Sequence, residues 1–221
     1  VINTYLATLT ANGAKGVIAN IPSVTDIPYF TTVPYNAVPL DAATAAALNQ
    51  SLYGPLKQVL TAFGQGSRIN LVSAGNNPIL IFDKDITDMK AQITGGLMAA
   101  GVDASTAGAL GTYFGQARQA TSKDLIVLTA SSVIGKNPAG NPSPFDKLGV
   151  TFPLDDKYVL TETEGAKVAT ATSAYNATLS ALADTYGLAF VDANAKMVEL
   201  KKTSGIQYDG VKYTATFVTG G

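Results

Sequence analysis

The sequence of 221 residues contains neither cysteine nor histidine. Without cysteine the chain can form no disulfide and no thiolate metal site, and it has no Cys nucleophile. Without histidine it lacks the commonest general base, so these residues alone cannot build a Ser-His-Asp triad. We therefore assign the chain no catalytic residue, no metal site and no cofactor.

Charge is also scarce, since charged residues make up 14% of the chain and the formal net charge is −1. Apart from Lys201-Lys202 there is no basic cluster, which argues against a nucleic-acid partner. No apolar run approaches the eighteen or so residues of a membrane span. At 47% hydrophobic residues, the chain is long enough to bury a core, and we expect one domain over residues 1–221.

Strand patterns and helical patterns alternate along the chain. Three runs are typical of strands buried on both faces: "GVIANI" (16–21), "DLIVLTA" (124–130) and "LAFVD" (188–192). Helical spacing covers 2–9, 41–63, 83–101, 104–120 and 161–186, and the last begins with the capping-box pair Thr161 and Glu164. A Gly54-Pro55 step should kink the second of these helices, and Asp209-Gly210 predicts a terminal hairpin. The alternation favours an α/β layer fold with a mainly parallel sheet.

The run "GVIANIPSVTDIPYF" (16–30) passes from a strand into a loop punctuated by prolines. In open α/β sheets, ligands bind where such loops leave the carboxyl ends of strands. One interpretation makes the loop a wall of a substrate cleft, with Ser23, Asp26, Tyr29 and Phe30 as substrate-binding residues. The other makes it a crossover loop held by two prolines. The residues favour neither.

Three further candidates have simpler structural interpretations, which we prefer. Asp192 could be a carboxylate at the active edge of the sheet, but an N-cap for the following helix is favoured. Ser131 and Ser132 follow a strand, yet without a G-x-S-x-G elbow they are better explained as loop hydroxyls. The acidic run "DKDITD" (83–88) lacks the glycine and the final Glu of a calcium loop, so it predicts an acidic helix N-terminus.

Three blocks carry a resemblance to a known family. They are "LTANGAKGVIANIPSVTDIPYFTTVPYN" (9–36), "PLDDKYVLTETEGAKVATATSAYNATLSALADTYGLAFVDANAKMVEL" (153–200) and "FVTGG" (217–221). They resemble segments of the SGNH, or GDSL-type, hydrolases, in a Bacteroidetes-type branch of lipase- and esterase-like proteins. Residues 65–122 match poorly and are expected to be an elaboration within the domain. The resemblance covers about half the chain.

The resemblance implies a three-layer αβα sandwich of flavodoxin-like type, with a mainly parallel sheet. In the family, the nucleophilic Ser and the oxyanion donors lie in blocks that would precede Val1. The Asp-x-x-His pair would follow Gly221. No residue of this chain matches those positions. The family also implies a small ester substrate (acyl or acetylated carbohydrate) and an exported setting, at the periplasm or cell surface and in some cases as a lipoprotein.

Two hypotheses follow for the function. In the first, the chain is part of a serine ester hydrolase and supplies scaffold and cleft wall. In the second, it is a non-catalytic surface protein that binds carbohydrate or lipid on a degenerate SGNH fold. The helical pattern at Val1 lacks an N-cap, and the chain stops directly after a strand-like run. We therefore expect a sandwich incomplete at both ends, whose remaining parts come from the same polypeptide or a partner chain.

Overall fold

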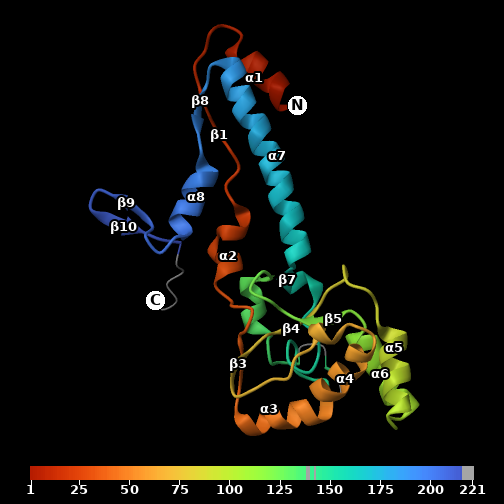
Figure 1. The fold of residues 1–221 in the computed structure, drawn as a ribbon. Coiled ribbons are helices and arrows are strands. Elements are labelled where there is room, and N and C mark those ends of the chain that lie inside the picture. Colours follow the sequence, from red (N-terminus) through yellow and green to blue (C-terminus); the bar gives the residue numbers. More distant parts are fainter. Residues whose placement is uncertain (138–139, 142, 216–221) are drawn as a thin grey trace. The chain divides into compact units, whose positions relative to one another are not determined.

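The computed structural model describes residues 1–137, 140–141 and 143–215 (Figure 1). Two compact units form: Val1–Thr32 with the chain from Glu164 onward, and Val33–Thr163. The elaboration expected at 65–122 falls inside the second unit. The block 217–221, which contributed to the family resemblance, lies outside the described residues.

The first unit holds the parallel strands that the sequence predicted. β1 pairs with β8 in parallel, with Ile18 opposite Phe190, and the two strands run side by side in Figure 1. The hairpin predicted around Asp209-Gly210 is confirmed, because both turn residues have positive φ, at 48° and 76°. The elements of this unit are α1 (Ile2–Thr10), β1 (Val17–Ala19), η1 (Val24–Asp26), α2 (Pro28–Thr31), α7 (Glu162–Tyr186, whose first two residues belong to the second unit), β8 (Ala189–Val191), α8 (Ala193–Lys201), β9 (Ile206–Tyr208) and β10 (Val211–Tyr213).

Both ends of α7 lie where the sequence places them. The helix begins directly after Thr161 and ends at Tyr186. Gly187 then takes a left-handed φ of 59°. The N–H of Leu188 donates to the carbonyl of Ala183 at 2.9 Å, which closes the last turn in the manner of a Schellman motif.

The expected burial of these parallel strands is wrong for the described chain. Val17 of β1 is 69% exposed and Val191 of β8 is 46% exposed. Each strand has one hydrogen-bonded neighbour, and the described residues add no third strand to the pair. Two short strands leave most of their apolar surface in water, whereas a parallel sheet is normally covered on both faces.

The second unit is built from helices packed around short antiparallel pairs. β2 pairs with β3, β4 with β5, and β6 with β7. Its core gathers fully buried side chains such as Tyr53, Leu56, Leu60, Ile93, Leu97 and Phe114. The elements are β2 (Val38–Leu40), α3 (Ala42–Leu48), η2 (Asn49–Tyr53), α4 (Gly54–Ala62), η3 (Gly66–Arg68), β3 (Gly75–Asn77), β4 (Leu80–Phe82), α5 (Lys90–Ala99), α6 (Ala104–Phe114), β5 (Ala117–Gln119), β6 (Leu125–Ile126), η4 (Leu128–Ser132), η5 (Asp156–Tyr158) and β7 (Val159–Leu160).

The break predicted at Gly54-Pro55 takes the form of a π-helical turn, η2, between α3 and α4. Pro55 has no N–H to donate, and the N–H of Gly54 bonds the carbonyl of Asn49, five residues back. A Cβ at position 54 would clash with that same carbonyl oxygen, so the wide turn requires glycine there. The chain passes from α3 into α4 without leaving the helix.

Three predicted element boundaries are wrong in this unit. The strand expected over 124–130 is β6 alone, followed by the 3₁₀ turn η4, because the residues after Ile126 lie opposite those before Val159, which form the 3₁₀ turn η5 rather than a strand. The helix expected from 83 begins only at Lys90, with Met89 as its N-cap, and the carboxylate of the preceding Asp88 accepts the Lys90 N–H at 2.8 Å in an Asx turn. The helix expected over 104–120 ends at Phe114, and the chain continues into strand β5.

The protein is therefore a mixed α/β structure with small sheets. Among the described strands, β1–β8 is the one parallel pair in a named sheet, and four pairs are antiparallel. A search of the same residues found no helix with both the length and the apolarity to cross a membrane.

Candidate functional site

Polar side chains gather where the two parallel strands end. Asn20 follows β1 and Asp192 follows β8, so both lie at the carboxyl edge of the pair. The Asn20 amide Nδ2 donates to Asp192 Oδ1 at 2.8 Å, and the Asn20 N–H donates to the carbonyl of Val191 at 3.2 Å. This edge is where an open α/β sheet presents its ligand site.

Asp192 also begins the helix α8. Its Oδ1 accepts the N–H of Ala195 at 2.9 Å, which confirms the N-cap interpretation. This backbone hydrogen bond and the one from Asn20 hold the pKa of Asp192 below its ordinary value, so the carboxylate stays ionised. The N–H of Asn194 in turn donates to Asn20 Oδ1 at 2.8 Å, so the two strand ends are locked together.

A second amide fixes the loop that leaves β1. Asn176 of α7 forms two hydrogen bonds with the backbone of Ile21. Its Oδ1 accepts the Ile21 N–H at 2.8 Å, and its Nδ2 donates to the Ile21 carbonyl at 2.9 Å. Asn194 Nδ2 donates to the same carbonyl at 3.0 Å. Three asparagines from distant parts of the sequence therefore position the start of the predicted cleft loop.

A cavity of about 460 Å³ opens beside this cluster, within the first unit. Amide, hydroxyl and carboxylate groups make up its polar lining, and valines from the loop, α7 and α8 make up much of the rest. Besides the Asn–Asp cluster the lining includes Ser23, Thr25, Thr172, Ser173 and Val198. Such a surface suits a ligand that offers several hydrogen-bonding groups and a modest apolar face.

The structure separates the four predicted substrate-binding residues. Ser23 lines the cavity, with its hydroxyl 3.4 Å from that of Thr25. Asp26 forms an ion pair with Lys201 of α8. Tyr29 and Phe30 pack edge to face, with ring centroids 5.1 Å apart, and neither they nor Asp26 belong to the lining. Substrate contact by these residues stays a prediction.

Sequence reasoning missed the asparagines that organise the site. Asn20 could have been found by the rule applied to Asp192, because both directly follow strands whose carboxyl ends share one edge. Asn176 lies in the middle of the helical pattern 161–186, where nothing in the sequence marks it as a site residue. Its role depends on Ile21, 155 residues earlier in the chain, and no local pattern reveals that pairing.

The other candidates behave as structural residues. The hydroxyls of Ser131 and Ser132 donate to the carbonyls of Leu128 and Thr129, at 2.7 and 2.8 Å. In the acidic run, Asp83 forms an ion pair with Arg118 at 2.6 Å. Across residues 1–137, 140–141 and 143–215, no three His, Cys, Asp or Glu side chains are grouped as a metal site would require.

Comparison with known proteins found no matching family model, no matching curated protein and no matching solved structure. The site is therefore interpreted from its own chemistry. It offers hydrogen-bond donors, acceptors and one anionic carboxylate. It offers no histidine to act as a base, because the sequence contains none.

Proposed function

We propose that this chain is part of a serine ester hydrolase of the SGNH type, for which it supplies scaffold and one wall of the substrate cleft. The observation that carries the proposal is the parallel pair β1–β8 with its polar cluster and cavity at the carboxyl edge. In α/β hydrolytic folds this edge holds the chemistry. The family resemblance of the sequence blocks around both strands points the same way.

The proposal includes a larger three-layer αβα sandwich than these residues form. Apolar side chains of the first unit lie open to water, among them Tyr5, Leu9, Val17, Tyr175 and Val191. A parallel sheet needs cover on both faces, so further strands and helices would bury these side chains. They would come from the same polypeptide or from a partner chain, and they would carry the Ser nucleophile, the His base and its Asp. An exported location belongs to the same proposal.

The test is ester hydrolysis by the whole polypeptide in which this sequence occurs. It should hydrolyse p-nitrophenyl acetate or butyrate and should be labelled covalently by a fluorophosphonate, which reacts with activated serines. A polypeptide that shows neither turnover nor labelling would refute the esterase assignment.

A pair of variants tests the cleft wall separately. Ser173→Tyr places a ring in the cavity from α7, and we expect it to lower kcat/KM by about tenfold or more, as misplacement of substrate does. Thr178→Tyr is the matched control, because Thr178 is an exposed residue of the same helix outside the cavity lining. Equal activity of the two variants would show that substrate does not use this cavity.

One observation also favours the second hypothesis, a binding protein without catalysis. The hydroxyl- and amide-rich lining suits a polyhydroxylated ligand such as a carbohydrate. Binding of glycans by the whole polypeptide, abolished by Ser173→Tyr and accompanied by no serine labelling, would establish this function instead.

A further inference from the structure

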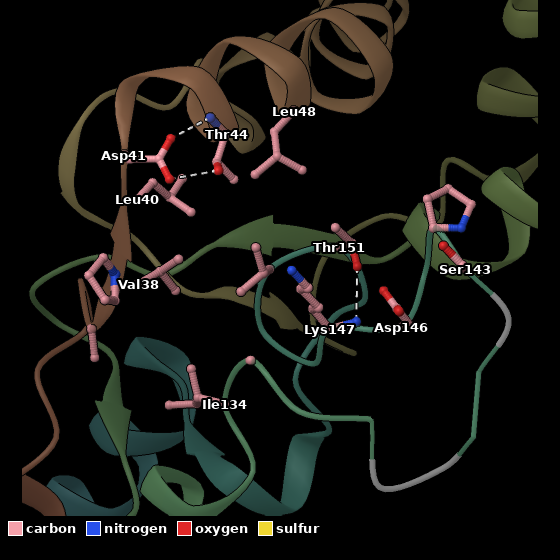
Figure 2. Close-up of a pocket in the computed structure, with 15 residues that line it drawn as sticks. Val38, Leu40, Asp41, Thr44, Leu48, Ile134, Ser143, Asp146, Lys147 and Thr151 are labelled. Atoms are coloured by element: carbon pink, nitrogen blue, oxygen red, sulfur yellow. Dashed lines mark hydrogen bonds between the residues drawn. The ribbon is translucent and has the colours of Figure 1, made fainter.

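The second unit contains its own cavity, of about 700 Å³, which the proposed ester chemistry does not use (Figure 2). It lies between β2 and the start of α3 on one side and the loops around Ile134 and Lys147 on the other. Its volume is within the range of small-molecule sites, about 300–1,000 Å³.

The body of this cavity is aliphatic. Its walls include Val38, Leu40, Leu48, Ile134 and Val150, and the described residues contribute no aromatic side chain to the lining. Val38 and Val150 are themselves buried, so they form a fixed floor rather than mobile surface groups. A branched or straight aliphatic group would bury apolar area here.

Charges of both signs border the aliphatic walls. Lys147 and the neighbouring Asp146 both line the cavity, and Figure 2 shows their side chains leaving the same loop. In the part of the chain that the structure describes, neither Lys147 nor Asp146 forms an ion pair. A third charge, the carboxylate of Asp41, is held by the N–H and hydroxyl of Thr44 at 2.7 and 3.0 Å.

The backbone of Lys147 is unusually well anchored for an exposed residue. Its N–H donates to Thr151 Oγ1 at 3.0 Å, and its carbonyl accepts the N–H groups of Thr151 at 2.8 Å and Phe152 at 3.1 Å. The carbonyl of Val150, in the same turn, accepts the buried hydroxyl of Tyr53 at 2.6 Å. These hydrogen bonds fix the turn to the core. The Lys147 side chain therefore starts from a rigid backbone, as residues of a binding site should.

We propose that this cavity binds a small zwitterion with an aliphatic body, namely a short peptide with free termini and aliphatic side chains. The ligand carboxylate pairs with Lys147, the ligand ammonium pairs with Asp146, and the aliphatic groups pack on Val38 and Ile134. A fatty acid would leave Asp146 unmatched beside its own negative charge, and a simple amine would leave Lys147 unmatched.

The first experiment is isothermal titration calorimetry of the whole protein with the dipeptide leucyl-leucine at low ionic strength. We expect saturable binding. We also expect that N-acetyl-leucyl-leucine and leucyl-leucinamide each bind about tenfold more weakly, because each lacks one charge-assisted hydrogen bond. No heat of binding at millimolar dipeptide would overturn the proposal, and so would octanoate binding as tightly as the dipeptide.

The second experiment uses charge variants. Lys147→Gln and Asp146→Asn should each weaken dipeptide binding by about tenfold and reduce the penalty for blocking the matching terminus. Lys136→Gln is the matched control, because Lys136 is an exposed lysine of the same unit that does not line the cavity. Dipeptide binding that Lys147→Gln leaves unchanged would refute the site. Because the described residues that line this cavity are all different from those that line the cavity beside β1 and β8, failure here leaves the ester hydrolase proposal untouched.

Discussion

Arg118 offers the sharpest test of what holds the second unit together. Its guanidinium donates to both carboxylate oxygens of Asp124 at 2.7 Å, and its Nε donates to Asp83 at 2.6 Å. The side chains of Asp83 and Asp124 are 4% and 0% exposed. Asp124 also accepts the N–H groups of Thr121 and Glu162, so the cluster joins β5, β6 and the start of α7.

Replacing Arg118 by Met should destabilise the unit strongly. The change leaves two buried carboxylates without their cation, and removal of one partner from a buried ion pair costs about 3–5 kcal/mol. Lys123→Met is the control, because the Lys123–Glu162 pair has a similar length of 2.6 Å but its side chains are 69% and 53% exposed. An ion pair between exposed side chains contributes little to stability, so this variant should unfold nearly as the parent does.

The loss of stability caused by Arg118→Met should change with pH in a definite direction. In the parent protein, burial alone would raise the pKa of Asp124, but the hydrogen bonds from Arg118 and two backbone N–H groups hold it below the ordinary value. Asp124 therefore stabilises the folded state at pH values above its pKa in the unfolded chain, about 3.9. This contribution is lost as the pH falls through the lower pKa that Asp124 has in the folded protein. In the variant only the backbone hydrogen bonds still oppose the effect of burial, so the folded pKa of Asp124 rises and acidification costs the variant less stability than it costs the parent.

The assay is urea unfolding followed by circular dichroism at pH 7 and pH 4.5. Arg118→Met should be less stable than the parent by several kcal/mol at pH 7, and this difference should shrink at pH 4.5, because the folded pKa of Asp124 is higher in the variant than in the parent. A deficit below about 1 kcal/mol at pH 7, or one that grows on acidification, would refute the reasoning.

Three further predictions concern packing and hydrogen bonding. Gly111→Ala should destabilise the packing of α5 against α6 by about 1–3 kcal/mol, because the new Cβ would lie 2.6 Å from a backbone carbonyl oxygen. Gly108→Ala is the control, because position 108 has open space around it, and this change should stabilise the protein by up to about 1 kcal/mol. The midpoint of thermal unfolding should therefore fall for Gly111→Ala and stay equal or rise for Gly108→Ala. Tyr53→Phe should cost about 1–2 kcal/mol in the same assay, because a buried carbonyl loses its donor, and an unchanged stability would contradict that hydrogen bond. Asn176→Ala should lower the hydrogen-exchange protection of the Ile21 amide by about tenfold, and unaltered protection would show that the asparagine does not hold the loop.

Local sequence signals predicted elements whose ends have their own chemistry. Helix α7 could be placed because Thr161 and Glu164 mark its start and Gly187 marks its end. The β9–β10 hairpin could be placed because Asp209-Gly210 accepts the positive φ angles that a tight turn needs. In each case the determining contacts span only a few residues.

Local sequence patterns gave the wrong bounds for elements whose structure depends on residues far away in the chain. The apolar run 124–130 has the composition of a buried strand, yet it pairs only as far as β7 allows before turning into η4. Likewise the acidic run 83–88 has helical spacing, but Asp83 accepts a hydrogen bond from Arg118, 35 residues away, and α5 begins only at Lys90. A pattern of local spacing contains no information about either partner.

The candidate site likewise has some features that local sequence predicts and others that depend on distant residues. By itself the sequence determined that a strand ends in a polar loop at Asn20 and another ends in a carboxylate at Asp192, and its lack of histidine excluded a complete triad. Only the tertiary structure decided that these strand ends lie together, that Asn176 grips Ile21, and that Ser23 rather than Tyr29 or Phe30 lines the cavity. The reason is physical: hydrogen bonds between residues 155 to 172 positions apart exist only after the parallel pair has formed.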